Sequence, residues 1–97
     1  MDAEHLLAAE ESLFEAQSVL KVFERAEPDD DRPRKALDAL KLWMRGELEV
    51  GKVRDAAFAA HAAARETTSE SAKFAARACG QAASVAHVIT HSWHVKR

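Results

Sequence analysis

The chain has 97 residues and a formal net charge of −2, a length that suits one domain with a modest core. It contains 21 alanines but no asparagine and only three glycines, which argues against a sheet built from hairpins, because hairpin turns depend on these residues. A hydrophobic content of 47% argues against a disordered chain. The composition therefore predicts a single all-α domain, and four amphipathic segments predict a four-helix bundle packed through alanine.

The first predicted helix spans residues 3–26. Apolar residues recur at steps of three and four from Leu6 to Phe23, which places them on one face of the helix. Leu7 and Phe14 border this face and are expected to widen it. The first helix therefore contributes one broad apolar side to the core.

The second predicted helix spans residues 32–45. Pro28 ends the helix before it, because a proline disfavours helical backbone at the preceding residue. Asp31 is the candidate N-cap of the second helix, and Gly46 is expected just beyond its end, where glycine tolerates a positive φ.

The third and fourth predicted helices span residues 52–66 and 69–95. The third is rich in alanine, which favours helix formation and close approach of neighbours. The segment that begins at Thr67 has the spacing of a capping box and is expected to start the fourth. The fourth helix divides into an apolar arc of Phe74, Ala78, Ala82, Val85, Ala86, Val88, Ile89 and Trp93, and a polar arc of Arg77, Gly80, Ser84, His87, His91 and His94.

Cysteine content and targeting signals indicate the compartment. Cys79 is the one cysteine, so an intramolecular disulfide is excluded, and a small core role is expected for it. The first residues lack the basic start and apolar run of a secretory signal. Residues 78–95 carry no Asp, Glu, Lys or Arg, but three histidines make the segment too polar to span a membrane. We expect a cytoplasmic protein that does not enter the membrane.

Charge is unevenly distributed along the chain. Residues 1–31 hold ten acids and two bases, and residues 32–97 hold six acids and twelve bases. Either an acidic first helix lies against a basic remainder, or an acidic face meets a basic partner protein whose association slows as salt rises. The bases are scattered and have no interleaved aromatic residues, so no nucleic-acid partner is expected.

Four blocks of sequence carry a family resemblance. They are Asp31-Arg32-Pro33-Arg34-Lys35-Ala36, Trp43-Met44-Arg45-Gly46-Glu47, the run from Ala56 to Arg65, and Gly80-Gln81-Ala82 with Ala86-His87-Val88 and His91. In order and spacing they resemble a bacterial immunity-like family, a helical domain of polymorphic toxin systems, over roughly residues 20–93. The resemblance implies an all-α fold and a protein that neutralises a partner such as a toxin.

A polar stripe on the third helix is the first candidate site. Arg54, Phe58, His61 and Arg65 share one side of a helical wheel. Either the two arginines reach solvent and His61 is a structural residue, or all three enter a polar pocket. The segment from Phe58 to Arg65 resembles the corresponding segment of the immunity-like family, which favours the interpretation as a polar pocket.

His87 and His91 form the second candidate site, since their i, i+4 spacing can place two imidazoles on one metal ion. His61, His94 or Glu47 could supply a third ligand, but the sequence lacks the glutamate of the zinc-protease motif, and no metal or cofactor is predicted. We expect instead a polar seam in which His87 and His91 are at least half buried against the second or third helix, because a solvated face normally carries charges.

The residues at the start of the second helix are the remaining candidates. Asp31, Arg32 and Arg34 can cap the helix and form salt bridges, or can contribute to an anion or partner site with Glu47. No spacing suggests a catalytic triad or a carboxylate pair, so no enzymatic activity is expected. Three interpretations stay open: a partner-binding protein, a metal- or ligand-binding domain that uses the histidines, and a structural homo-oligomer.

Overall fold

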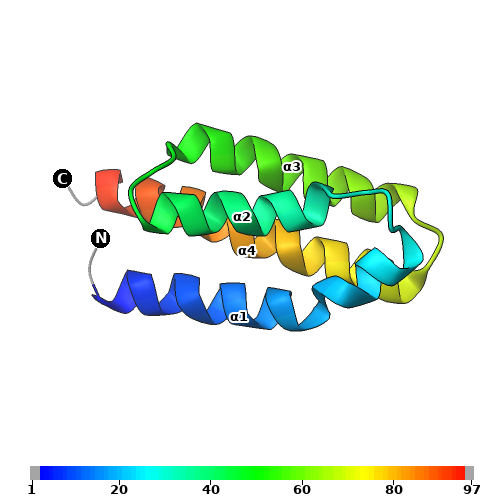
Figure 1. Ribbon diagram of the computed structural model, residues 1–97. Coiled ribbons are helices and arrows are strands. Elements are labelled where there is room, and N and C mark those ends of the chain that lie inside the picture. Colours follow the sequence, from blue (N-terminus) through cyan, green and yellow to red (C-terminus); the bar gives the residue numbers. More distant parts are fainter. Residues whose placement is uncertain (1–2, 96–97) are drawn as a thin grey trace.

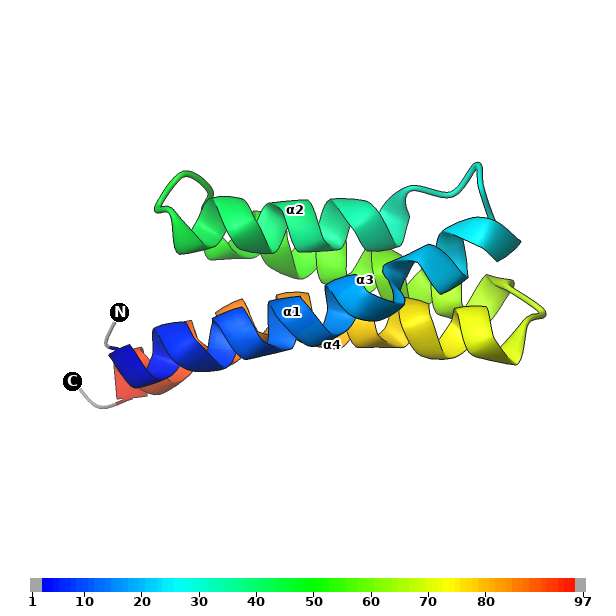
Figure 2. The same ribbon diagram turned by 60° about the horizontal axis from the view of Figure 1, so that its bottom comes forward.

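The protein is a bundle of four helices with extents of 43 × 21 × 20 Å, which confirms the all-α prediction (Figures 1 and 2). The computed structural model describes residues 3–95 and the side chains of residues 3–89. No strand occurs within residues 3–95. The helix bounds differ from those expected by at most two residues: α1 is Ala3–Ala26, α2 is Arg32–Met44, α3 is Val50–Glu66 and α4 is Glu70–Val95.

Helix α4 is the centre of the bundle, because it contacts each of the other three helices. In Figure 1, α3 and α1 lie at the top and bottom, and α2 lies in front of α4. Over the described residues 3–95, no Cα atom of α1 lies within 8 Å of a Cα atom of α3, although side chains of both helices, such as Phe23 and Ala63, belong to one buried cluster. The surface of α4 that lies between α1 and α3 holds the candidate site.

The core is made mainly of small side chains. Among the side chains that the structure describes, 14 of the 21 buried apolar residues are alanine. The largest fully buried side chains are Phe23, Leu37 and Leu40, which come from α1 and α2. Alanine allows two helices to approach closely, but each contact buries little apolar area. The bundle is thin as a result.

Several large apolar side chains lie outside this core, contrary to the sequence prediction. Leu7 and Phe14, expected to widen the apolar face of α1, are 55% and 74% exposed. Phe74 and Val88, expected in the apolar arc of α4, are 66% and 60% exposed. The reason is that α4 packs against three helices. Its buried side consists mainly of small residues at spacings of three and four: Ala72, Ala75, Ala76, Cys79, Gly80, Ala82, Ala83 and Ala86. Among the described side chains, Ile89 is the large residue of the predicted arc that is buried.

Asp31 is the N-cap residue of α2, as predicted, and its carbonyl oxygen accepts the Lys35 N–H at 2.9 Å. Among the described residues, its side chain accepts no capping hydrogen bond. The preceding aspartate supplies one, because Asp30 Oδ1 accepts hydrogen bonds from the Arg32 backbone N–H at 3.1 Å and from Arg32 Nε at 2.9 Å. The Asp31 carboxylate pairs with Lys35 at 3.2 Å, one turn into the helix.

The end of α2 agrees with the sequence prediction. Gly46 has a φ of 76° and donates its N–H to the Trp43 carbonyl oxygen at 2.9 Å. The Glu47 N–H reaches back to the Leu42 carbonyl oxygen at 2.8 Å. These two hydrogen bonds define a Schellman motif, in which the residue with positive φ is best filled by glycine.

The link between α3 and α4 also differs in its details from the expected capping box. The cap of α4 is Ser69, whose Oγ accepts the Ala72 N–H at 3.2 Å. Thr67 is 95% buried at the end of α3 and donates its hydroxyl to Glu27 Oε2 at 2.8 Å. The Thr67 side chain therefore joins the α3–α4 link to the α1–α2 link by a hydrogen bond, instead of capping α4.

Gly46 and Gly51 lie near the two ends of the link between α2 and α3, and their replacement by alanine should change the stability of the protein in opposite directions. Gly46→Ala should destabilise the protein by about 1–2 kcal/mol, because a Cβ strains the left-handed backbone. Gly51→Ala should stabilise it by about 0.4–1 kcal/mol, because Gly51 is helical and a Cβ there meets open space. Urea unfolding of both variants measures the difference, and a loss of stability in Gly51→Ala would contradict this account.

Candidate functional site on the surface of α4

The side chain of His61 on α3 packs directly over Gly80 on α4. A Cβ built at Gly80 would lie 2.7 Å from both Cε1 and Nε2 of His61, closer than real Cβ atoms approach other atoms. The imidazole therefore occupies the space that a side chain would take at position 80. His61 is half-buried by this contact and Gly80 is buried.

This contact fixes which residues of the two antiparallel helices lie at the same level. Arg65 follows His61 by four residues and Arg77 precedes Gly80 by three, so they lie about 6 Å and about 4.5 Å from the contact, both towards the link at 67–69. In the opposite direction, Arg54 and His87 are each seven residues away, about 10 Å along the helix axes.

The seven arginines whose side chains the structure describes fall into two groups by their partners. Arg32, Arg34 and Arg45, at the two ends of α2, all form salt bridges. The other four are exposed and form no ion pair or side-chain hydrogen bond within residues 3–89: Arg25 lies on α1, and the rest lie on α3 and α4. We call the three on α3 and α4 the basic strip: Arg54, Arg65 and Arg77.

Arg32, one of the predicted site residues, joins the two links at one end of the bundle. Its Nη2 lies 2.6 Å from Asp30 Oδ2 and 2.8 Å from Glu66 Oε1. These hydrogen bonds from the guanidinium hold the pKa of the Asp30 carboxyl and of the Glu66 carboxyl below their ordinary values. Arg32 thus connects the start of α2 to the end of α3.

The other predicted residues near α2 are engaged in similar pairs. Arg34 binds Glu24 of α1 through two hydrogen bonds of 2.6 and 2.7 Å, which lower the pKa of Glu24. Glu47 pairs with Arg45 at 3.0 Å. The salt bridges predicted for Arg32 and Arg34 are present. The structure does not bring Asp31, Arg32, Arg34 and Glu47 into one site with the histidines.

The predicted polar seam is wrong for His87, which is exposed. His61 contacts the bare backbone of Gly80 instead, and His87 lies two turns further along α4. His91 and His94 fall outside the side chains that the structure describes. Within the described residues, no group of three or more His, Cys, Asp or Glu could hold a metal ion.

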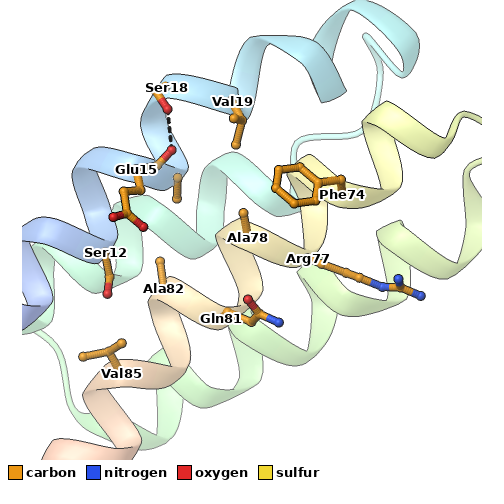
Figure 3. Close-up of a pocket in the computed structure, with 11 residues that line it drawn as sticks. Ser12, Glu15, Ser18, Val19, Phe74, Arg77, Ala78, Gln81, Ala82 and Val85 are labelled. Atoms are coloured by element: carbon orange, nitrogen blue, oxygen red, sulfur yellow. Dashed lines mark hydrogen bonds between the residues drawn. The ribbon is translucent and has the colours of Figure 1, made fainter.

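A groove between α1 and α4 is the largest hollow of the candidate site (Figure 3). Its volume is about 570 Å³, and Ala16, Ala78 and Ala82 are among the small residues that line it. A second hollow, lined by Phe74 with Val19 and Val22, continues from it. The side chain of Phe74 therefore stands where the two hollows meet. We call them together the α1–α4 groove.

The two sides of the groove differ in charge. Glu15, Ser12 and Ser18 line it from α1, and Arg77 and Gln81 line it from α4. Figure 3 shows the Arg77 side chain extending away from α1, so its guanidinium lies on the outer side of α4. Arg77 consequently belongs both to the groove and to the basic strip.

Sequence reasoning missed this groove because it assigned Phe74 and Val85 to the core. The signal that could have revealed it is the stripe of small residues on α4, which competes with the larger side chains for the buried side of the helix. Cys79 lies on this stripe and is fully buried, as predicted. Its burial raises the pKa of the thiol to about 12, so Cys79 is a packing residue and not a nucleophile.

These features define a small all-α bundle with an exposed groove and an unpaired basic strip beside it. The chain belongs to the family described as Imm-5 like putative immunity protein, which matches residues 12–97 and confirms the resemblance seen in the sequence. No curated protein and no solved structure matches the chain. None of the helices, over the described residues, is long and apolar enough to cross a membrane.

The contact between His61 and Gly80 predicts strong coupling between these positions. Gly80→Ala should destabilise the native protein, because displacing the imidazole costs more than the roughly 1 kcal/mol that alanine gains in a helix. In a His61→Ala background the same change should instead stabilise by about 1 kcal/mol. Unfolding of the two single variants and the double variant measures the coupling. Equal effects of Gly80→Ala in both backgrounds would show that the imidazole moves aside freely.

Proposed function

We propose that this protein is an immunity protein that binds and neutralises a partner protein, and that the α1–α4 groove receives apolar side chains of that partner. The groove beside Phe74 is the observation that carries the proposal. Family membership supports the general role, because the family is named for immunity. A toxin encoded beside this gene is the partner that such a role implies.

The energetics of the groove support a protein partner. Phe74 is 66% exposed, although burying its ring would be favourable by roughly 1.5–3 kcal/mol. Exposed aromatic residues beside a hollow are typical of the few side chains that dominate a protein interface. The polar rim of Glu15, Ser12 and Gln81 offers hydrogen bonds around this apolar centre, as interface rims do.

The proposed role is not catalytic. Residues of the groove include two carboxylates, Glu15 and Glu70, and one arginine, Arg77, but none of the described histidines lines it. His61 is packed on Gly80, and His87 is exposed further along α4. Binding alone is sufficient for neutralisation, since a partner that covers the active surface of a toxin blocks access to it.

Two phenylalanines provide a matched test of the groove. Phe74→Ala should weaken binding of the purified toxin encoded beside this gene by at least about tenfold, because it removes the central apolar contact. Phe14 is 74% exposed on α1 and does not line the groove, so Phe14→Ala should leave the affinity within about threefold. Calorimetric titration of both variants measures the dissociation constants.

Growth of cells that express the toxin provides a second measure of the same difference. Phe14→Ala should still protect the cells, whereas Phe74→Ala should protect them less. Equal protection and equal affinity in the two variants would refute the groove as the binding site. Thermal unfolding of each variant alone establishes that both fold.

A further inference from the structure

We propose that the basic strip of Arg54, Arg65 and Arg77 docks an acidic segment of the partner protein, next to the apolar contact in the groove. This inference rests on the proposed function and specifies the chemistry of the partner. It differs from the interpretation that an acidic face of this protein meets a basic partner.

The three arginines of the basic strip are available to bind a partner. They are exposed, and none of them forms an ion pair or side-chain hydrogen bond within residues 3–89. Their counterparts at the ends of α2 are each held by a carboxylate at 3.0 Å or less. A guanidinium without a partner can donate two parallel hydrogen bonds to a carboxylate of another molecule.

The three arginines also lie along one surface. Because His61 contacts Gly80, Arg65 on α3 and Arg77 on α4 lie at about the same height along the bundle axis. Arg54 follows on the same side of α3, eleven residues from Arg65 and so about 16 Å along the axis. Phe58 lies between these two arginines and is 63% exposed.

The nearby acids face elsewhere. On an ideal helix, Asp55 and Glu66 lie about 100–120° around α3 from Arg54. Glu66 is also bound by Arg32, and Glu70 lies 3.8 Å from Lys73. Glu15 lies on the far side of the groove, on α1. Glu66 is the acid that Arg65 affects, but the pKa of its carboxyl is lowered mainly by the hydrogen bonds from Arg32 and only to a smaller extent by the charge of Arg65. The strip therefore keeps an excess of positive charge.

These positions specify an acidic segment with an apolar centre. Its carboxylates would meet the arginines at the two ends of the strip, and an apolar side chain would cover Phe58 between them. Exposed ion pairs contribute little to affinity by themselves. They contribute more when a partner covers them, and they accelerate association through long-range attraction. Arg77 joins this surface to the groove, so one partner can occupy both.

A protein segment fits the strip better than a nucleic acid does. Nucleic-acid grooves combine several basic residues with aromatic platforms that stack successive bases. Here the strip offers three arginines and a single phenylalanine, Phe58, and Glu15 would repel phosphates at the groove. Binding of single-stranded nucleic acid is nonetheless included as an outcome of the test.

The test uses the full chain and three probes of defined chemistry. The probes are a helical peptide with leucine on one side and glutamate on the other, the same peptide with lysine in place of glutamate, and an oligothymidylate of matching charge. The glutamate peptide should bind, should shift the NMR signals of the arginine side chains of the strip, and should bind more weakly as salt rises. Failure of this peptide to bind, or tighter binding of either other probe, would overturn the proposal.

Two triple variants of equal charge locate the binding. Arg54→Gln with Arg65→Gln and Arg77→Gln should weaken binding of the glutamate peptide by at least about tenfold. The control neutralises three exposed bases elsewhere, which form no salt bridge within residues 3–89, and should weaken binding by less than about threefold. The control changes are Lys21→Gln, Arg25→Gln and Lys52→Gln. Equal losses in the two variants would mean that only net charge matters, and would refute the strip.

The same triple variants, titrated with the purified toxin, separate this inference from the proposed function. If Phe74→Ala weakens toxin binding but the strip variant does not, the groove is the binding site and the strip proposal is wrong. If neither change weakens binding, both proposals are wrong.

Discussion

The organisation of this bundle follows from the close approach of α3 and α4. A helix that contacts three neighbours cannot place large side chains on all of its buried sides without holding those neighbours apart. Helix α4 meets this constraint with alanine, cysteine and glycine, and at Gly80 even a Cβ is excluded because the imidazole of His61 fills the space. The position of α3 on α4, and therefore the alignment of the surface arginines, depends on this contact.

The displaced large side chains determine what the surface can do. Once small residues occupy the buried side of α4, Phe74 and Val88 must face outwards, and alanines remain to line the hollow towards α1. The same packing that makes the core thin therefore creates an apolar groove on the surface. Charge also differs across this surface, because Glu15 lines the groove from α1 and Arg77 lines it from α4.

Local signals in the sequence predicted the helices well and the buried sides less well. The α1 bounds, the role of Gly46 and the burial of Cys79 depend on short-range chemistry and were predictable. Asp31 was correctly predicted as the N-cap of α2, but the hydrogen bond that the Asp30 carboxylate accepts at the helix start was not, because either of the two adjacent carboxylates could reach it. Phe74 was misplaced because a helical wheel weights residues by hydrophobicity, whereas a helix with three neighbours selects them by size. His87 was misplaced because the lack of charged residues around it was taken as a sign of burial, although the side chain is exposed. The contact of His61 with Gly80 joins residues 19 positions apart, and no local pattern encodes it.

The alanine core has a further consequence for the temperature dependence of folding. The heat-capacity change on unfolding is governed largely by the apolar area that becomes hydrated. A core in which 14 of 21 buried apolar residues are alanine exposes less of this area than a leucine-packed bundle of equal length. The free energy of unfolding of such a protein therefore depends only weakly on temperature and decreases slowly above and below the temperature of maximum stability. Cooling consequently weakens the fold less than in a protein held by large side chains.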